Sequence, residues 1–210
     1  LENPLGKYYM YFAHHGGKFI RLAYADDLRG PWTIHEPGTL TLEQVQAAIP
    51  RFYAHIASPD VIIDNEKQSL IMYFHAPDRV REGGAQKTGV ATSKNGLHFN
   101  VRKPIIAPFY FRYFQHDGVH YGISKNFSKS AWLMRGTDPL RPFEEQRPVI
   151  ARMRHAAVLL QDDLLMVFCS RTGDAPERIM LFTADMSAPW EEWKFEGPID
   201  ILRAEYPWEG

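Results

Sequence analysis

Four stretches of the chain repeat one pattern of apolar and polar positions. Each has an apolar strand, a tight turn, a second strand rich in aromatic residues, a polar loop, a third strand and a closing loop with an aromatic residue. Second strands are predicted at 8–12, 70–74, 119–123 and 164–168, and third strands at 20–24, 89–93, 131–135 and 179–183. A repeat of roughly 45 residues with about four short strands is typical of a β-propeller blade.

The other strands of each repeat complete this prediction. Innermost strands are predicted at 61–63, 109–111 and 156–160, each followed by turn-forming residues, and outer strands at 33–35, 100–102, 147–149 and 194–195. No first strand precedes Tyr8, and residues 198–210 look like the start of another unit. The sequence therefore predicts an all-β, five-bladed β-propeller, with four blades visible and partial strands at the ends. A four-bladed propeller, closed or open, is the alternative.

One insertion breaks the period and predicts a short helix near 41–49. Thr41 followed by Gln44 fits a capping box. Leu42, Val45 and Ile49 fall on one helical face, and Pro50 ends the pattern.

Composition limits the class of protein and its partners. The chain has 210 residues and a formal net charge of −1, without a run of basic residues, so we expect no nucleic-acid partner. No apolar stretch approaches the roughly 20 residues of a membrane span, so we expect no membrane partner. Cys169 is the single cysteine, which excludes an internal disulfide and suggests a buried, inert thiol. Residues 1–210 are expected to form one domain, truncated at both ends; compartment and oligomeric state are not predicted.

Blade topology predicts which loops share a face. Strands within a blade alternate in direction, so the start of each innermost strand lies beside the loop between the second and third strands. That face collects 58–60, 107–108, 153–155 and the long polar loops 13–17, 75–87, 124–127 and 170–178. Function usually resides in such loops, so we expect a cleft at this mouth of the channel.

Three segments carry a resemblance to a known family. Ser58-Pro-Asp-Val61 opens an inner strand, Arg154-His155 opens a later one, and residues 25–32 read Ala-Asp-Asp-Leu-Arg-Gly-Pro-Trp. In these segments the chain resembles glycoside hydrolase family 43 and its five-bladed relatives. The resemblance implies a base on the first blade, an orienting aspartate on the second and a general-acid glutamate on the third. Asp60 matches the orienting residue and the base would precede Leu1, whereas the acid position holds Ile106-Ala-Pro108.

Another carboxylate on the same face could replace the missing acid. We expect Glu177 to be catalytic together with Asp60, because glycoside hydrolysis requires an acid and a base across the scissile bond. Glu177 and Asp174 lie in one loop, flanked by Arg171 and Arg178. The alternative is that these four residues form an ion-paired loop clamp.

The substrate-binding residues are predicted from the same face. They are His55, Arg154, His155, Arg171, Asp174 and Arg178. For His55 the competing interpretation is a polar surface loop, and for His155 a channel histidine without chemistry. If Arg154, Arg171 and Arg178 converge, the ligand is anionic: a uronate, a sulfated sugar or phosphate.

These residues predict a glycoside-hydrolase-like protein acting at the channel mouth on a carbohydrate, which is anionic if the three arginines converge. No cofactor is expected to be required and no metal site is predicted, although His155 could lie near a calcium ion or a water in the central channel. The alternatives are a non-catalytic carbohydrate-binding propeller and a glycoside phosphorylase similar to family 130. A protein-interaction propeller is weaker, because the chain lacks a Gly-His or Trp-Asp repeat signature.

Overall fold

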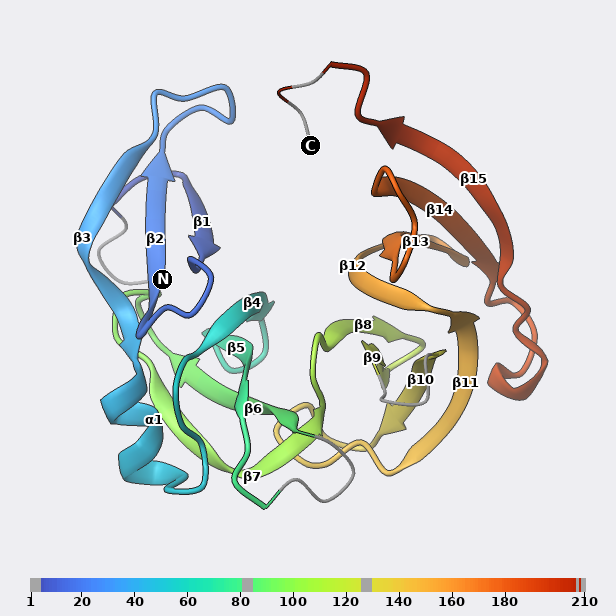
Figure 1. The fold of residues 1–210 in the computed structure, drawn as a ribbon. Helices are drawn as coiled ribbons and strands as arrows, with labels where there is room; N and C mark the ends of the chain where they lie inside the picture. The colour runs from blue at the N-terminus through green and yellow to red at the C-terminus, as the bar shows by residue number, and fades with distance from the viewer. Residues whose placement is uncertain (1–4, 81–84, 126–129, 207, 209–210) are drawn as a thin grey trace. The chain divides into compact units, whose positions relative to one another are not determined.

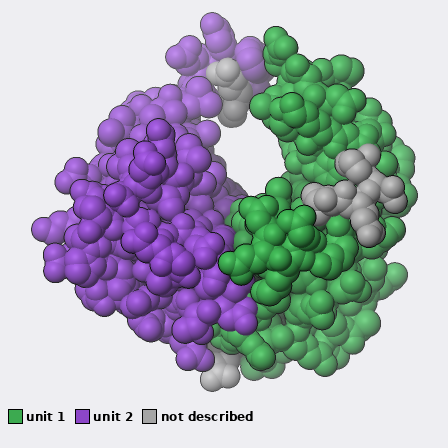
Figure 2. Space-filling view, turned by 180° about the vertical axis from the view of Figure 1, so that it is seen from behind, with its two compact units in different colours: residues 1–111, 140–142 green, residues 112–139, 143–210 purple. Residues whose placement is uncertain are grey.

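The computed structural model describes residues 5–80, 85–125, 130–206 and 208. Its regular structure is almost entirely antiparallel β-sheet (Figure 1). The chain divides into two compact units, residues 1–111 with 140–142 and residues 112–139 with 143–210 (Figure 2). Each unit contains two sheets in which consecutive strands are neighbours.

The first unit holds a three-stranded sheet, a helix and a four-stranded sheet. The three-stranded sheet consists of β1 (Tyr8–Phe12), β2 (Phe19–Ala25) and β3 (Thr33–Thr41). The four-stranded sheet consists of β4 (Ala57–Asp64), β5 (Ser69–Pro77), β6 (Gln86–Ser93) and β7 (Asn100–Pro108). In the sequence, α1 (Leu42–Ala48) follows β3 and precedes β4. It begins at the predicted capping box, in which the Gln44 amide donates to the Thr41 hydroxyl and the Thr41 amide donates to the Gln44 side chain.

The second unit holds two four-stranded sheets. One consists of β8 (Arg112–His116), β9 (Val119–Lys125), β10 (Ser130–Gly136) and β11 (Glu145–Ala151). The other consists of β12 (Met153–Gln161), β13 (Leu164–Arg171), β14 (Arg178–Asp185) and β15 (Glu196–Arg203), with the short 3-10 helix η1 (Trp190–Glu192) before β15.

Each unit has its own apolar core, formed where side chains alternate inward along the strands. In the first unit Ile20, Leu40, Met72 and Phe74 pack with α1 residues such as Val45. The core of the second unit is built in the same way, from residues that include Ile123, Leu133, Leu165, Val167 and Met180.

The innermost strand predicted at 109–111 was wrong. Residues 109–111 are not an innermost strand: Tyr110 has φ 55°, which breaks an extended segment, and β8 begins at Arg112. Residues 106–108 therefore do not open the third inner strand but end β7, where Ala107 pairs with Thr88 and Pro108 with Lys87. Residues 109–111 are aromatic and therefore matched the pattern of a strand. The pairing of β7 with β6 instead sets the end of β7 at Pro108.

The end of the chain also differs from the prediction. The outer strand expected at 194–195 begins at Glu196, after η1. Residues from 198 do not start another unit, because Ile199 pairs with Leu181 and Leu202 with Ile179. The alternating apolar residues of β15 resemble an inner strand, but they complete the fourth sheet.

The predicted class is confirmed: the protein is all-β, built from propeller-type blades, with one short α-helix among the described residues. The described residues form four such sheets, and a fifth is not among them. The organisation of residues 1–210 as one domain stays a prediction. Within the described ranges, no helix has the length and apolar character needed to cross a membrane.

Candidate functional site

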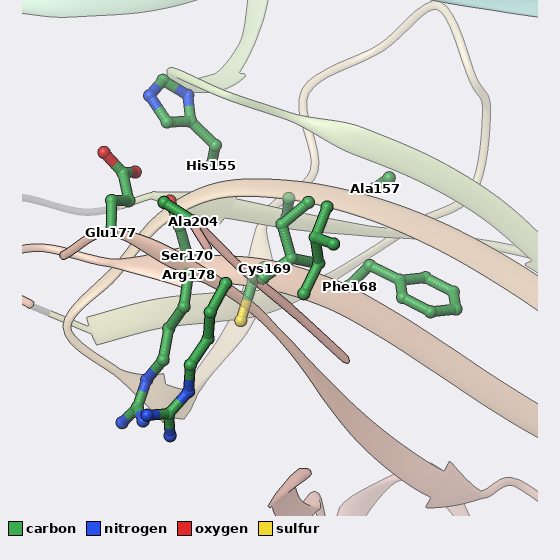
Figure 3. Close-up of a pocket in the computed structure, with 12 residues that line it drawn as sticks. His155, Ala157, Phe168, Cys169, Ser170, Glu177, Arg178 and Ala204 are labelled. Atoms are coloured by element: carbon green, nitrogen blue, oxygen red, sulfur yellow. The ribbon is translucent and has the colours of Figure 1, made fainter. Parts of the chain in front are cut away.

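The second unit carries a pocket of about 600 Å³ at one end of the sheet β12–β15 (Figure 3). We call it the sheet-end pocket. It is lined by His155, Ala156, Ala157, Phe168, Cys169, Ser170, Glu177, Arg178, Ile179, Leu202, Arg203 and Ala204. The antiparallel register brings the starts of β12 and β14 to the ends of β13 and β15, with Ala157 opposite Phe168 and Ile179 opposite Leu202. Within this sheet, the innermost strand thus begins beside the loop between the second and third strands, as predicted.

The pocket has an apolar part and a polar part. Phe168, Ile179 and Leu202 contribute apolar surface. Figure 3 shows His155 and Glu177 on one side of the pocket, whereas the Arg178 guanidinium points away from both. Such a surface can hold a ligand that has both an apolar face and hydrogen-bonding groups.

A β-bulge at the start of β12 places Arg154 and His155 at the surface together. The register with β13 shifts between Met153 and Ala156, and Arg152 just before the strand has φ 61°. In a regular strand, two adjacent side chains point to opposite faces. Here both are exposed, because the bulge redirects one of them, as bulges commonly do next to functional sites.

Electrostatics favour a neutral His155 imidazole at neutral pH. Partial burial lowers the pKa of His155, and the neighbouring Arg154 guanidinium lowers it further. Lys125 and Arg112 act in the same direction, whereas Glu177 opposes them. A neutral imidazole can accept a hydrogen bond from a ligand hydroxyl at one nitrogen and donate one from the other.

Glu177 is engaged by an arginine. Its Oε2 lies 2.8 Å from Arg154 Nη1, and both side chains are roughly half exposed. Asp174 forms a separate clamp, with Oδ1 3.1 Å from Arg152 Nη2 and Oδ2 3.5 Å from Arg178 Nε. Ion pairing in this loop is thus present, as the alternative interpretation expected, although Arg152 was not foreseen as a partner.

The three arginines expected to converge have separate contacts. Arg154 pairs with Glu177, and Arg178 contacts Asp174 and Asp200. The Arg171 guanidinium instead lies over the Phe182 ring, 5.2 Å from its centroid. Arg171 and Asp174 do not line the sheet-end pocket.

Two small residues of β13 complete the pocket. The Ser170 side chain is buried, with the residue only 7% exposed, and its hydroxyl has no hydrogen-bond partner within the described part of the chain. A buried hydroxyl without a partner is costly, so a ligand or water that bonds to it is favoured. Burial raises the pKa of the Cys169 thiol to about 11, so the thiol is protonated and inert at neutral pH.

Asp60 lies in the first unit, on β4. It is half-buried and opposite Tyr73 of β5. The register of this pair of strands shifts between Ala57 and Asp60, and Ser58 has φ 50°. A bulge with a left-handed non-glycine residue therefore precedes Asp60, and such strained backbone often accompanies functional sites.

His55 is also in the first unit, among aromatic rings. Its ring lies 6.1 Å from His75, which in turn lies 4.7 Å from Tyr110. Partial burial lowers the pKa of His55, and the nearby His15 adds to this effect, whereas a hydrogen bond with Gln86 opposes it. His55 is thus partly enclosed, unlike a histidine of a plain surface loop.

Of the eight predicted site residues, Asp60 and His55 belong to the first unit and the other six to the second. His155, Glu177 and Arg178 share the sheet-end pocket, and Arg154 contacts Glu177. That Asp60 acts at the same site as Glu177 stays a prediction.

Sequence reasoning missed Ser170, Arg152 and Arg203. Arg152 precedes a predicted inner strand and Ser170 begins the predicted polar loop 170–178, so position on the loop face could have indicated both. Arg203 could not be found in this way, because its strand was assigned to another unit.

A calcium ion or a water near His155 stays a prediction. Hard cations prefer several oxygen ligands, and the charged groups acting on His155 are three cations, Arg154, Lys125 and Arg112, and one carboxylate, Glu177. Across the described ranges, no group of three or more His, Cys, Asp or Glu residues could hold a metal ion.

One viral protein is similar to the chain in sequence. "Uncharacterized protein R118" of Acanthamoeba polyphaga mimivirus is 34% identical over 226 residues, which cover 97% of this chain and 62% of that protein. The chain therefore spans less than two thirds of the length of this relative. No protein-family model matches the chain.

Solved structures share the fold at low sequence identity. A GH43 protein from Bacillus licheniformis has a TM-score of 0.70 and 15% identity, covering 97% of this chain and 42% of its own. An exo-β-1,3-galactanase from Phanerochaete chrysosporium has a TM-score of 0.66 and 16% identity, covering 92% and 47%. The α-L-arabinanase of Cellvibrio cellulosa has a TM-score of 0.62 and 16% identity, covering 91% and 70%. At this identity the likeness shows the fold alone: the chain has the β-propeller fold of these glycoside hydrolases.

Proposed function

We propose that the protein acts on a carbohydrate, as a glycoside-hydrolase-like β-propeller, and that the sheet-end pocket holds a sugar. The observation that carries this proposal is the buried Ser170 hydroxyl, which has no partner among the described residues and lines a pocket that also contains His155 and Glu177. The fold adds support, because the galactanase that shares it was solved with β-1,3-galactotriose.

The pocket chemistry suits a sugar ring. A pyranose or furanose has apolar C–H faces and a rim of hydroxyls, and ligand pockets typically combine apolar walls with a few polar groups. Phe168 and Ile179 offer the apolar surface, and Ser170, His155 and Glu177 offer partners for the hydroxyls. Arg178 and Arg203 also line the pocket, and we propose that an anionic sugar would pair with arginine at the end where the Arg178 guanidinium points, away from His155 and Glu177.

Hydrolysis would require two carboxylates across the glycosidic bond. We propose Asp60 and Glu177 for this chemistry, with Asp60 in the orienting role. The ion pair with Arg154 engages Glu177 Oε2, so a general-acid role requires either that Oε1 carries the proton or that the pair opens when substrate binds.

A non-catalytic carbohydrate-binding protein is the second candidate. The observation that favours it is the sequence between the end of β7 and the end of β8, because residues 106–116 contain no carboxylate. The resemblance to family 43 places its acid near this position.

We also propose a fifth blade, packed on the outer face of the sheet β12–β15 beyond the sheet-end pocket. Leu159 and Ile199 on this face, which do not line the pocket, are 53% and 56% exposed. The opposite face of the same sheet is buried in the core of the second unit. An apolar sheet face normally packs against another layer, and more than a third of the mimivirus relative lies outside its match to this chain.

Sugar binding and turnover test the proposal together. Oligosaccharides and aryl glycosides are screened with the 210-residue chain, with and without phosphate, and binding is followed by calorimetry. Binding that weakens about threefold to tenfold in Ser170→Ala is expected from the loss of one hydrogen bond. Turnover that Asp60→Asn removes supports the hydrolase, phosphate-dependent turnover supports the phosphorylase, and binding alone supports the second candidate. The absence of any sugar binding would refute both.

A further inference from the structure

We infer that Arg152, Arg178 and Arg203 form an oxyanion-binding site, which takes a phosphate, sulfate or carboxylate group. The site is a second pocket of about 340 Å³ in the second unit, the arginine pocket, lined by Arg152, Gly173, Asp174, Ala175, Pro176, Arg178 and Arg203. It adjoins the sheet-end pocket, since Arg178 and Arg203 line both. The inference does not depend on sugar binding.

The charges of this cluster do not balance. Two carboxylates, Asp174 and Asp200, contact the three guanidinium groups. The hydrogen bond from Arg203 lowers the pKa of Asp200, and the charge of Arg178 lowers it further. The Asp200 carboxylate therefore stays charged at neutral pH. One positive charge is left over, which an anion in the pocket would neutralise.

The strand register places two of the arginines directly opposite each other. Arg178 of β14 and Arg203 of β15 are Cα partners. Like charges at directly opposite positions of an antiparallel pair destabilise a sheet. A single oxygen, Asp200 Oδ2, contacts both guanidinium groups. A bound oxyanion would relieve the remaining repulsion, so this arrangement is better suited to a ligand site than to a purely structural clamp.

Several donors of these arginines are available. Arg178 donates only to Asp200 and Arg203 only to Asp200, among the hydrogen bonds of the described residues. The Arg178 Nε is buried and lies 3.5 Å from Asp174 Oδ2, without a hydrogen bond. Because a guanidinium carries five N–H groups in a planar fork, each side chain can still present a pair of donors to an oxyanion.

Arg152 is held in place before any ligand binds. Its Nε and Nη2 donate to the Thr172 carbonyl at 3.0 and 2.6 Å, and the Thr172 amide donates to the Arg152 carbonyl at 2.8 Å. Gly173 has φ 87°, and a Cβ on it would lie 3.1 Å from Arg152 Nη2, so glycine provides both the turn and the space. Preorganised donors bind an anion with less loss of conformational entropy.

Titration at constant ionic strength tests the site. Inorganic phosphate, sulfate, glucuronate and glucose are titrated into the 210-residue chain with chloride as the balancing anion, and binding is measured by calorimetry and by the rise in melting temperature. We expect saturable binding of oxyanions that weakens at least about tenfold in Arg203→Gln, because a charge-assisted pair is lost. Arg203→Lys should restore part of the affinity, since it keeps the charge but not the fork.

The matched control is Arg29→Gln, which removes an exposed arginine paired with Asp27 in the first unit. Equal binding of phosphate, sulfate and glucuronate supports a site for a free oxyanion, and binding of glucuronate without phosphate or sulfate supports a site for an acidic sugar. No saturable binding, binding of glucose as tight as that of glucuronate, or equal weakening by Arg29→Gln would overturn the inference.

Discussion

Replacing Ser170 by alanine should change stability and ligand affinity in opposite directions. The hydroxyl is buried, and no described residue bonds to it. Burying a polar group without a partner costs about 1–3 kcal/mol. Ser170→Ala removes that cost, but it also removes packing contacts and any hydration of the hydroxyl. We therefore expect the free energy of unfolding to stay equal or to rise by up to about 1 kcal/mol.

The matched control is Ser93→Ala, which removes another buried serine hydroxyl. Ser93 Oγ donates to Asn95 Oδ1 at 3.1 Å and accepts from the Gly96 amide at 2.9 Å. Losing these bonds should destabilise the protein by about 1–2 kcal/mol. The two substitutions remove the same group from a buried position, and they contrast a hydroxyl that has protein partners with one that has none among the described residues.

Urea unfolding of both variants measures the difference, with the slope of the transition checked for a change in the surface exposed. A sugar that bonds to Ser170 should at the same time bind about threefold to tenfold more weakly to Ser170→Ala. If Ser170→Ala destabilises the protein as much as Ser93→Ala, the hydroxyl already has a partner, and the argument for a ligand at this position fails.

Three further predictions concern other parts of the chain. Asp78 is fully buried and bonded to Arg51 at 2.6 and 2.5 Å, so Asp78→Asn should cost about 3 kcal/mol in urea unfolding. Burial raises the pKa of Asp78, but the hydrogen bond from Arg51 and other contacts outweigh burial and lower the pKa overall. The ionised Asp78 should therefore stabilise the fold above the unfolded pKa of about 3.9, and this stabilisation should decline as the pH falls below that value. If Asp78→Asn leaves the acid sensitivity of unfolding unchanged, this reasoning is wrong. Ile199→Lys should change the free energy of unfolding of the 210-residue chain by no more than about 0.5 kcal/mol, because the side chain is exposed. In a longer protein whose fifth blade covers this face, the same substitution should be strongly destabilising. Equal melting temperatures of the longer protein and its Ile199→Lys variant would exclude that blade. Glu177→Gln should change stability by less than about 1 kcal/mol, since its pair with Arg154 is at the surface, but abolish turnover if it is catalytic; retained turnover would remove it from the mechanism.

Much of the strand pattern could be read from the sequence, because alternation of apolar residues is a local property. All the predicted second and third strands, and the outer strands at 33–35, 100–102 and 147–149, lie within observed strands. The helix was found for the same reason, since the Thr41–Gln44 capping box acts over four residues. The failures occurred where pairing with a partner strand, rather than local pattern, set the boundary, as in β7 and β15.

The candidate site was only partly predictable. The loop face of the fourth sheet followed from strand alternation, which placed His155, Glu177 and Arg178 together. The sequence could not show that the Ser170 hydroxyl is buried without a protein partner, or that Arg203 lies opposite Arg178. It likewise could not choose which carboxylate each arginine contacts, because residues far apart in the chain compete for the same partner.

The sequence by itself determined that the chain forms short antiparallel strands in blade-like repeats, because side-chain alternation and turn residues act between near neighbours. Only the tertiary structure decided that residues 196–203 complete the fourth sheet and leave one apolar face exposed, and that three arginines contact two aspartates, Asp174 and Asp200. Those outcomes depend on strand register and burial, which arise from contacts between distant segments.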